Sequence, residues 1–453
     1  MPTTEAWKLL THGPSSRDVR GALTMSADSR PSRRSFLNAS GLVLGALVGE
    51  RLARAEELRP ETERPGRWSR EAPLVSVNCA VVGLGDQGRE ILRTLATLPG
   101  AVVKTICDTH KASHKRALEF APRAKATTDY RKILDDRDVR AVWVATPSHL
   151  HKDIVLAALA AGKHVYCEAP LAHTIADARA IAEAARRAPA QVFQVGIQRR
   201  ANLLDMHIFG LLRLGILPRL LLVQAQYHHR SSWRRAASTR ERQAELDWRL
   251  DDALSPGLAG EIGIHQIDLL SWYLRKRPLS VSAFGGVMAW PDGRKVPDLI
   301  HATLDYGNGV HLVYSASLGN SFGSGAEMLF GSEGTIMIQN DHAWLIKEAD
   351  ASAQDWEVYA AREAIGSEVG LVLVANASKL LEDVRDPAKL RNAETKGALF
   401  YACESFLRAL RAGIPAAPGA QEGLDATVVA LTVNEAVRAG TKITFRKEWF
   451  DLA

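Results

Sequence analysis

The stretch VSVNCAVVGLGDQGREILRTLATL, residues 75–98, decides the fold. Its first part, 75–82, is rich in Val, as expected for a central parallel strand that is covered on both faces. Apolar side chains recur at helical spacing in 89–98. The turn between these two parts consists of Gly83, Leu84, Gly85, Asp86, Gln87 and Gly88. Strand, GxGxxG turn and helix in this order predict a Rossmann domain whose turn binds the pyrophosphate of a dinucleotide.

The next apolar run, 101–107, ends at Asp108, which lies 20 residues after Gly88. A carboxylate at this distance receives the hydroxyls of the adenosine ribose and repels a 2′-phosphate. The spacing therefore favours NAD over NADP as the cofactor. His110 and Lys111 follow closely and could offset that repulsion, so NADP stays open as the second possibility.

Two further runs, 141–145 and 162–167, read as buried strands that end in polar turns. In open α/β sheets, ligands bind outside the carboxyl ends of the strands, so both turns are expected at the nicotinamide end of the cofactor. The side chains predicted to bind the cofactor there are Thr146, Pro147, Ser148, His151 and Glu168.

Composition separates the N-terminal region from the rest of the chain. The 453 residues suffice for two hydrophobic cores, and the formal net charge is +6. Residues 1–55 hold eight basic and four acidic side chains, so they carry +4 of that charge. The remainder is close to neutral, and we expect no nucleic-acid partner. The four cysteines are too few and too scattered for a disulfide framework or a zinc site, and no metal is expected.

Residues 1–55 are predicted to be a twin-arginine signal region. Arg33 and Arg34 precede the apolar run 39–48, and Ala-Arg-Ala at 53–55 offers a cleavage site. The apolar run is about half of the ~20 residues that a membrane span needs, so no stable anchor is expected after cleavage. The expected partner is the twin-arginine translocase, and the expected location is the periplasm or another exported site.

Export by this route implies a tightly held cofactor, because the translocase carries folded proteins and no free nicotinamide pool is expected outside the cytoplasm. Met25 lies at a more usual distance from the arginine pair than Met1, so translation could start there. The polar residues 56–73 read as a linker or arm. We assign 74–197 to the dinucleotide-binding domain and 198–453 to a second domain.

The second domain shows short β-like runs separated by Gly, Asn and Asp. They are 220–227, 279–286, 300–306, 309–317, 334–338 and 343–346. A late helical segment follows at 399–412. These runs indicate a sheet of several short strands in the C-terminal part.

Several motifs together resemble the glucose–fructose oxidoreductase and inositol dehydrogenase (Gfo/Idh/MocA) family. They are ATPSHLH at 145–151, AGKHVYCEAP at 161–170, VGIQRR at 195–200, GEIGIHQID at 260–268 and FGSEGTIMI at 330–338. The resemblance implies an α/β fold, with an N-terminal Rossmann domain and a C-terminal α/β domain built on a large, mostly antiparallel open sheet. It also implies a substrate between the domains, a late helix returning to the Rossmann domain, and a homo-dimer or homo-tetramer formed through the open sheet.

The Glu168-Ala169-Pro170 turn departs from the family pattern. In family dehydrogenases the middle residue is a lysine that contacts the reacting hydroxyl. Alanine can neither donate nor accept a proton, and a positioned acid or base contributes ~10²–10⁴ in rate. The departure leaves simple alcohol dehydrogenation in doubt.

The second catalytic element of the family is an aspartate four residues before a histidine, and Glu261 and His265 stand at those positions. A spacing of four places both side chains on one helical face. Histidine suits removal of a hydroxyl proton near neutral pH, so His265 is the predicted base. Glu261 is either its orienting partner or a carboxylate that binds substrate, and Asp268 could steady the helix or the histidine.

The predicted substrate-binding residues are Arg199, Arg200, Tyr227, His229 and Trp233. Arginine forks suit hydroxyl, carboxylate and phosphate groups, and aromatic side chains beside polar ones suit the faces and edges of a sugar. A metal site at the adjacent histidines 228 and 229 is not favoured. Neighbouring strand residues point to opposite faces, and no third ligand stands at a diagnostic spacing.

Three functions remain compatible with these residues. The first is an exported NAD(P)-dependent oxidoreductase that transfers a hydride from a sugar or glycoside. The second is an NAD-dependent glycoside hydrolase or lyase that oxidises its substrate transiently, which fits both cofactor retention and Ala169. The third is a non-catalytic sugar-binding protein, against which the intact Asp108, Glu261 and His265 count.

Overall fold

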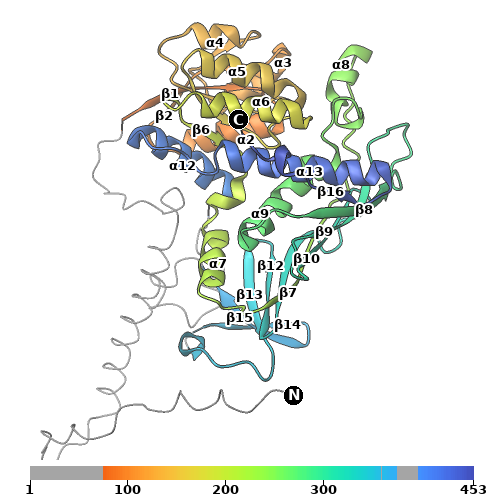
Figure 1. Cartoon of the computed structure of the whole chain (residues 1–453). Coiled ribbons are helices and arrows are strands. Elements are labelled where there is room, and N and C mark those ends of the chain that lie inside the picture. The colour runs from red at the N-terminus through yellow and green to blue at the C-terminus, as the bar shows by residue number, and fades with distance from the viewer. Residues whose placement is uncertain (1–74, 359, 375–395, 453) are drawn as a thin grey trace, which may run out of the picture. The chain divides into compact units, whose positions relative to one another are not determined.

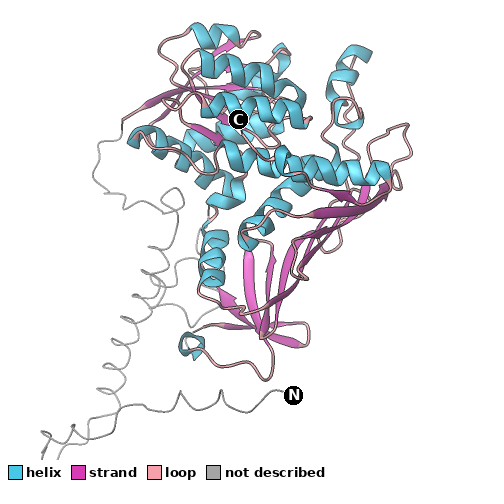
Figure 2. Cartoon of the chain, in the orientation of Figure 1, coloured by secondary structure: helices cyan, strands magenta, loops and turns pink. Residues whose placement is uncertain are grey.

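The computed structural model describes residues 75–358, 360–374 and 396–452. The predicted signal region (1–55) and linker (56–73) lie outside these ranges. The described chain contains a parallel sheet with its helices and a larger, mostly antiparallel sheet (Figures 1 and 2). This is the predicted α/β architecture. No helix within the described ranges is long and apolar enough to cross a bilayer.

The N-terminal domain is built on a six-stranded sheet with the order β3-β2-β1-β4-β5-β6. The strands are β1 (Val77–Val82), β2 (Ala101–Cys107), β3 (Lys125–Thr127), β4 (Ala141–Val144), β5 (His164–Cys167) and β6 (Phe193–Val195). All neighbouring pairs are parallel. The chain reverses its direction of winding between β1 and β4, and the ends of these two strands form the crevice in which a Rossmann fold binds its dinucleotide.

Amphipathic helices cover this sheet. They are α2 (Asp86–Thr97), α3 (Lys111–Leu118), α4 (Arg131–Asp135), α5 (His151–Ala160) and α6 (Ile175–Arg186). α2 buries Ile91, Leu92 and Leu95 against the sheet, which explains the helical spacing of apolar residues after the glycine turn. It begins three residues before the predicted start, so the helix takes in the last part of the turn itself.

The C-terminal domain contains a ten-stranded sheet with the order β14-β15-β13-β12-β11-β7-β10-β9-β8-β16. The strands are β7 (Leu220–His228), β8 (Ser280–Gly286), β9 (Leu299–Asp305), β10 (His311–Ser317), β11 (Gly325–Gly331), β12 (Gly334–Gln339), β13 (His342–Lys347), β14 (Arg362–Ile365), β15 (Glu368–Leu373) and β16 (Ile443–Thr444). Only the pair of β7 and β10 is parallel among the described pairs.

The remaining helices are α7 (Leu203–Arg213), α8 (Arg240–Leu246), α9 (Ile264–Leu274), α12 (Ala398–Ala412) and α13 (Ala420–Ala439). Short 3₁₀ turns occur at Ser148–Leu150, Gln198–Ala201, Trp248–Leu250, Asp355–Val358 and Lys447–Trp449, and a π-helical turn at Ala259–Gly263. α13 contacts α6 and β6 of the first domain and α9 and β8 of the second. It therefore joins the two domains (Figure 1).

α12 completes the core of the Rossmann domain. Its Phe406 is fully buried and meets Trp143 edge-on, at 5.0 Å between ring centroids, and Tyr166 at 5.8 Å. Burying one such ring stabilises the fold by about 1.5–3 kcal/mol, and each aromatic pair adds about 0.5–1.5 kcal/mol. A segment more than 200 residues away in the sequence thus closes the nucleotide-binding domain.

Candidate active site

The glycine turn is shaped to receive a diphosphate. Gly83 has a φ of +91°, which L side chains rarely adopt, and a Cβ on Gly88 would collide with the carbonyl oxygen of Gly83. A Cβ on Gly85 would meet no atom within 4 Å, so the backbone there is open. Gly85 is also the N-cap of α2 and offers no side-chain cap. The first N–H groups of the helix are left for an anion, and a dinucleotide fits this turn.

Asp108, at the end of β2, is tied to the same turn. Its Oδ2 accepts a hydrogen bond from the backbone N–H of Leu84 at 2.9 Å, and its Oδ1 accepts one from His110 N–H at 2.8 Å. These bonds fix the carboxylate beside the glycine turn, with lone pairs still available for ribose hydroxyls. The geometry agrees with the role that the sequence spacing predicts for Asp108.

The turn after β4 presents an unsatisfied hydroxyl. The Oγ1 of Thr146 is buried and has no hydrogen-bond partner in the described part of the chain. A buried hydroxyl without a partner is costly, and a bound polar ligand would satisfy it. Pro147 begins the 3₁₀ turn by accepting a hydrogen bond from the N–H of Leu150. The observation supports the placement of a polar cofactor group at this strand end.

His151, which we predicted to bind the cofactor, is enclosed by backbone groups of the fold. It is 1% exposed, its Nε2 lies 2.8 Å from the carbonyl oxygen of Thr146, and its Nδ1 lies 3.1 Å from that of Pro170. Because the ring is enclosed between two backbone carbonyls, it joins the turn after β4 to the turn after β5. It positions these two turns, and a contact of its ring with the cofactor stays a prediction.

Glu168, at the end of β5, is a buried carboxyl group with neutral partners. It accepts hydrogen bonds from Gln87 Nε2 at 2.9 Å and Gln198 Nε2 at 3.4 Å. Burial raises the pKa of Glu168 to about 7, and the two amides only partly offset this effect. Gln87 belongs to the glycine turn, so Glu168 connects the pyrophosphate end of the site with the Glu168-Ala169-Pro170 turn.

Glu261 connects the two domains. It lies in the π-helical turn that precedes α9, where Asn434 of α13 accepts a hydrogen bond from Ala259 N–H at 3.2 Å. Its Oε1 accepts a hydrogen bond from Ser148 Oγ at 3.2 Å, and its Oε2 pairs with Arg249 Nε at 2.6 Å. Ser148 stands at the end of the cofactor strand β4. The bond therefore places Glu261 at the cofactor crevice.

His265 follows in the first turn of α9 and is partly buried. Burial lowers its pKa to about 4. The negative charge of Asp268 opposes this shift and the positive charge of Arg199 adds to it. It forms no hydrogen bond within the described residues, so Glu261 does not hold it directly. At neutral pH the imidazole is therefore uncharged.

A group of side chains beside Glu261 was not predicted from the sequence. The ring of Trp248 lies 5.8 Å from that of His149, which lies 6.1 Å from the ring of His173. The Nδ1 atoms of both histidines are buried without a partner in the described ranges. Arg249 also stacks on Trp248. His149 lies in the ATPSHLH motif, but no periodicity or spacing links it to His173 or Trp248, because only the fold brings them together.

Arg199, predicted to bind substrate, is instead occupied by carboxylates of its own domain. Its Nη2 pairs with Asp205 at 2.8 Å, its Nε donates to the same carboxylate, and its Nη1 pairs with Glu327. Asp205 and Glu327 are both buried. The guanidinium therefore neutralises two buried acids and is not available as a substrate fork.

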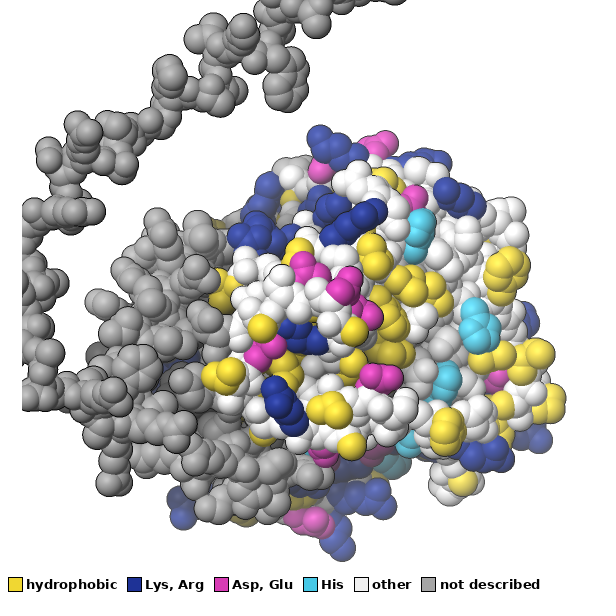
Figure 3. Space-filling view, turned by 90° about the horizontal axis from the view of Figure 1, so that it is seen from below, with side chains coloured by type: hydrophobic (Ala, Val, Ile, Leu, Met, Phe, Trp, Pro, Cys, Tyr) yellow, Lys and Arg dark blue, Asp and Glu magenta, His cyan; other side chains and the backbone are white. Residues whose placement is uncertain are grey.

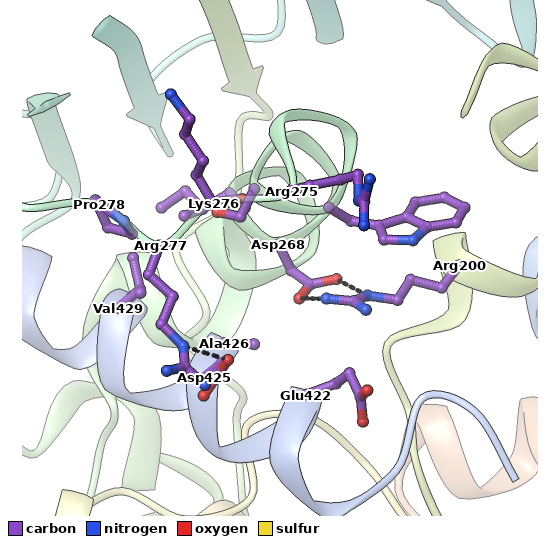
Figure 4. A pocket seen from close by; sticks show the side chains of 13 residues that line it. Arg200, Asp268, Arg275, Lys276, Arg277, Pro278, Glu422, Asp425, Ala426 and Val429 are labelled. Atoms are coloured by element: carbon purple, nitrogen blue, oxygen red, sulfur yellow. Dashed lines mark hydrogen bonds and ion pairs between the residues drawn. The ribbon is translucent and has the colours of Figure 1, made fainter. Parts of the chain in front are cut away.

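Arg200 is paired as well. Its Nε and Nη2 donate to both oxygens of Asp268, each at 2.8 Å (Figure 4). The two residues line a pocket between α9 and α13 in which Arg277 faces Asp425. None of the residues of the cofactor turns lines this pocket. The predicted contact of Arg200 with substrate is thus replaced by an ion pair that anchors α9.

The other predicted substrate residues lie at and after the end of β7. Tyr227 is partly buried, and its ring centroid lies 6.3 Å from that of the exposed His229. Trp233 has a φ of +58° and packs against the main core. Within the described chain, no hydrogen bond or ring contact joins these three to Glu261 or His265. Their contact with a substrate stays a prediction.

The described residues contain no group of three or more His, Cys, Asp or Glu side chains that could hold a metal ion. His228 contacts the Phe322 carbonyl oxygen and the Ser315 hydroxyl, each at 3.2 Å. Its ring is thus engaged within the sheet.

Comparison with known proteins identifies the family. Residues 77–197 match the model of an oxidoreductase family with an NAD-binding Rossmann fold, GFO/IDH/MocA. Residues 211–337 match the model of the C-terminal domain of the same family. Together the two matches cover more than half of the chain.

Individual relatives act on sugars and polyols, according to their names. Inositol 2-dehydrogenase of Salmonella typhimurium is 28% identical over 212 residues, 46% of this chain and 58% of that protein. Levoglucosan dehydrogenase of Pseudarthrobacter phenanthrenivorans is 27% identical over 62% of this chain and 78% of that protein. Alpha-N-acetylgalactosaminidase of Shewanella oneidensis is 26% identical over 44% of this chain and 47% of that protein. The match thus spans about half of the first and third of these relatives.

A solved structure shares the fold across both domains. Levoglucosan dehydrogenase in complex with NADH and L-sorbose superposes with a TM-score of 0.68 at 20% identity, over 82% of this chain and 99% of that chain. The two family models cover the Rossmann domain and the part of the second domain up to residue 337. The chain therefore belongs to the GFO/IDH/MocA oxidoreductase family.

Proposed function

We propose that this protein is an exported NAD-dependent oxidoreductase that transfers a hydride from a sugar or glycoside and holds its cofactor tightly. The observation that carries the proposal is the hydrogen bond between Ser148 and Glu261, which joins the end of the cofactor strand β4 to the π-helical turn before His265. It sets the predicted base next to the crevice that fits a dinucleotide. The sugar dehydrogenases among the relatives support the substrate class.

Different residues would hold different parts of the cofactor. The open first turn of α2 would bind the pyrophosphate, and Asp108 would accept the ribose hydroxyls. The hydroxyl of Thr146 and the carboxyl group of Glu168 would face the nicotinamide end. When bound, NAD supplies a hydride acceptor. The Asp108 carboxylate favours NAD over NADP by charge repulsion of a 2′-phosphate.

The chain's own contribution to the reaction is positioning and proton transfer. His265, neutral at pH 7, would take the proton of the reacting hydroxyl as hydride leaves the same carbon. Glu261 is held by Arg249 and Ser148, and its remaining lone pairs would accept hydrogen bonds from neighbouring sugar hydroxyls. These roles require the closed arrangement of the two domains that the cross-domain bond maintains.

The second candidate function is redox-neutral cleavage of a glycoside. Ala169 carries no group that could assist a lasting alcohol oxidation, and the match with an alpha-N-acetylgalactosaminidase supports this chemistry. A resident cofactor suits this reaction, since hydride would be taken and returned within one turnover. A twin-arginine export route favours the same retention.

One experiment separates the candidates. The purified protein is incubated with a panel of sugars and aryl glycosides without added cofactor, while bound-NADH absorbance and aglycone release are followed together. Lasting reduction supports the oxidoreductase, and aglycone release without lasting reduction supports the glycosidase. Silence across the panel favours a sugar-binding protein. A mature protein purified without any bound nucleotide would contradict tight cofactor binding.

We also propose that the open face of the large sheet meets a second copy of the chain. The strand register aligns Thr303, Val313, Gln224, Met328, Met337 and Trp344 in one row across six strands, and none of them is buried. Figure 3 shows hydrophobic and histidine side chains gathered on part of the face seen from below. Light scattering is expected to find a dimer or tetramer, and Met337→Glu should dissociate it. A monomeric wild type would contradict the proposal.

A further inference from the structure

We infer that Arg235, from the C-terminal domain, is a cofactor-binding residue that reaches across to the glycine turn and pairs with the pyrophosphate. The inference rests on the proposed function, because it requires a dinucleotide in the Rossmann crevice. It adds a residue outside the Rossmann domain to those that hold the cofactor. The segment that delivers Arg235, residues 230–250, is called the crossing segment below.

The primary observation is an ion pair between the domains. Arg235 Nη2 pairs with Oδ2 of Asp86, a residue 149 positions earlier in the sequence. Asp86 is the first residue of α2, directly after its N-cap Gly85. The N-terminal end of this helix is where a Rossmann fold receives the diphosphate. Arg235 is thus held beside the anion-binding end of the cofactor turn by a residue of that turn.

The charges at this point explain why a second arginine is present. The carboxylate of Asp86 would repel a diphosphate bound to the same helix end. Arg89, on the next turn of α2, already pairs with Oδ1 of Asp86 at 2.5 Å. With one arginine and one carboxylate, the turn carries no surplus positive charge. Arg235 supplies that surplus, and about half of its side chain remains exposed, so donors remain available for a phosphate.

The backbone that carries Arg235 is braced by its own segment. Gln243 of α8 donates through Nε2 to the carbonyl oxygen of Arg235 at 2.6 Å and accepts from Ala237 N–H at 3.0 Å. The neighbouring Arg234 pairs with Asp247 at 2.8 Å and with Asp292 at 3.0 Å. These contacts fix the loop on both sides of Arg235, which lowers the entropy cost of presenting its guanidinium.

The C-terminal part of the crossing segment is also anchored, close to the turn after β4. Trp248 contacts the ring of His149 in the first domain, and Arg249 pairs with Glu261. The segment therefore touches the Rossmann domain at two points, at the turns after β1 and after β4. A cofactor lying between these turns would be enclosed by the segment. Such an enclosure would slow the release of the cofactor.

The test measures release of NADH, which does not depend on turnover. Protein loaded with NADH is mixed with excess NAD, and the loss of bound-NADH fluorescence gives the dissociation rate. Arg235→Ala should release NADH roughly tenfold faster, as expected for the loss of a charge-assisted hydrogen bond. Arg240→Ala is the matched control, because Arg240 is an exposed arginine on the same segment. It should release NADH at the wild-type rate.

A second background separates cofactor binding from simple tethering of the domains. In Asp86→Ala protein the ion pair is already absent, and Arg235→Ala should still accelerate NADH release there. If it has no effect in that background, Arg235 acts only through Asp86 and the inference is overturned. Equal release rates for Arg235→Ala and Arg240→Ala in the wild-type background overturn it as well. A wild-type protein that binds no NADH contradicts the proposed function itself, which is a different result.

Discussion

Two buried carboxyl groups near the domain boundary have opposite surroundings. Asp205, in the C-terminal domain, faces the guanidinium of Arg199 through both of its oxygens. Glu168, in the Rossmann domain, faces only the amides of Gln87 and Gln198, and its pKa rises to about 7. The first pair is neutralised and supports the fold. The second leaves a carboxyl group poised near neutral pH beside the cofactor crevice, which is typical of a functional position.

The largest expected effect is the loss of turnover when His265, the predicted base near the Arg199–Asp205 pair, is replaced. The charges around Arg199 support the fold, and His265 is the predicted base. His265→Ala should therefore lower kcat by ~10²–10⁴ while nucleotide stays bound. The control is His301→Ala, which removes an exposed histidine on β9. Turnover retained in His265→Ala would refute its role as the base.

Removing Asp205 tests whether the paired group is structural. Asp205→Ala leaves the Arg199 guanidinium with one carboxylate fewer and deprives the Tyr273 hydroxyl of an acceptor at 3.1 Å. Breaking a buried pair in this way costs about 3–5 kcal/mol in the free energy of unfolding. Chemical denaturation should show this loss, whereas Asp252→Ala, at an exposed position, should change stability little. Similar stabilities of the two variants would break the comparison.

Glu168 should respond to pH in the opposite way to a paired acid. Its folded-state pKa is about 7 and its usual value is 4.5, so the folded protein binds more protons between these values. Its contribution to stability is therefore lost as pH rises from about 4.5 to 7, by about 3 kcal/mol. Glu168→Gln should abolish this decline, so that the variant is more stable than the wild type at pH 8. Denaturation at several pH values measures this.

The exposed Glu119 provides the control for that measurement. Glu119→Gln should leave the pH dependence of stability as it is in the wild type. Parallel pH profiles for Glu168→Gln and the wild type would show that burial does not perturb the carboxyl group, and the contrast with Asp205 would disappear.

Local patterns predicted four of the six strands of the first domain and missed the short strands β3 and β6. The bounds of β2 were predicted residue for residue, and β1, β4 and β5 differ from the predicted runs by only a few residues. Continuous apolar runs followed by turns make such strands readable. β11 was missed because it carries Glu327, a buried acid that interrupts the apolar pattern. Glu327 is stable there only because Arg199 neutralises it, and such long-range pairing leaves no local signal.

The part of the site that was predictable from the sequence is the glycine turn, where one local turn sets the positions of its residues. The glycine turn and Asp108 lie together as expected from their spacing. Of the two roles left open for Glu261, the structure does not show contact with His265, because its carboxylate bonds to Ser148 and Arg249. The π-helical turn changes the local geometry, and Asn434 from another helix holds it in place. Cross-domain partners of this kind depend on topology, which motif spacing does not encode.

The insertion of α12 into the Rossmann core has a consequence for the order of folding. During synthesis, the strands β1 to β6 leave the ribosome about 200 residues before the helix that covers Trp143 and Tyr166. The nucleotide-binding domain therefore cannot reach its final packing while the sheet of the second domain is being made. We expect a ribosome-bound chain that stops before α12 to be protease-sensitive and unable to retain NADH. The final packing of both domains would then form late in synthesis, at about the same time.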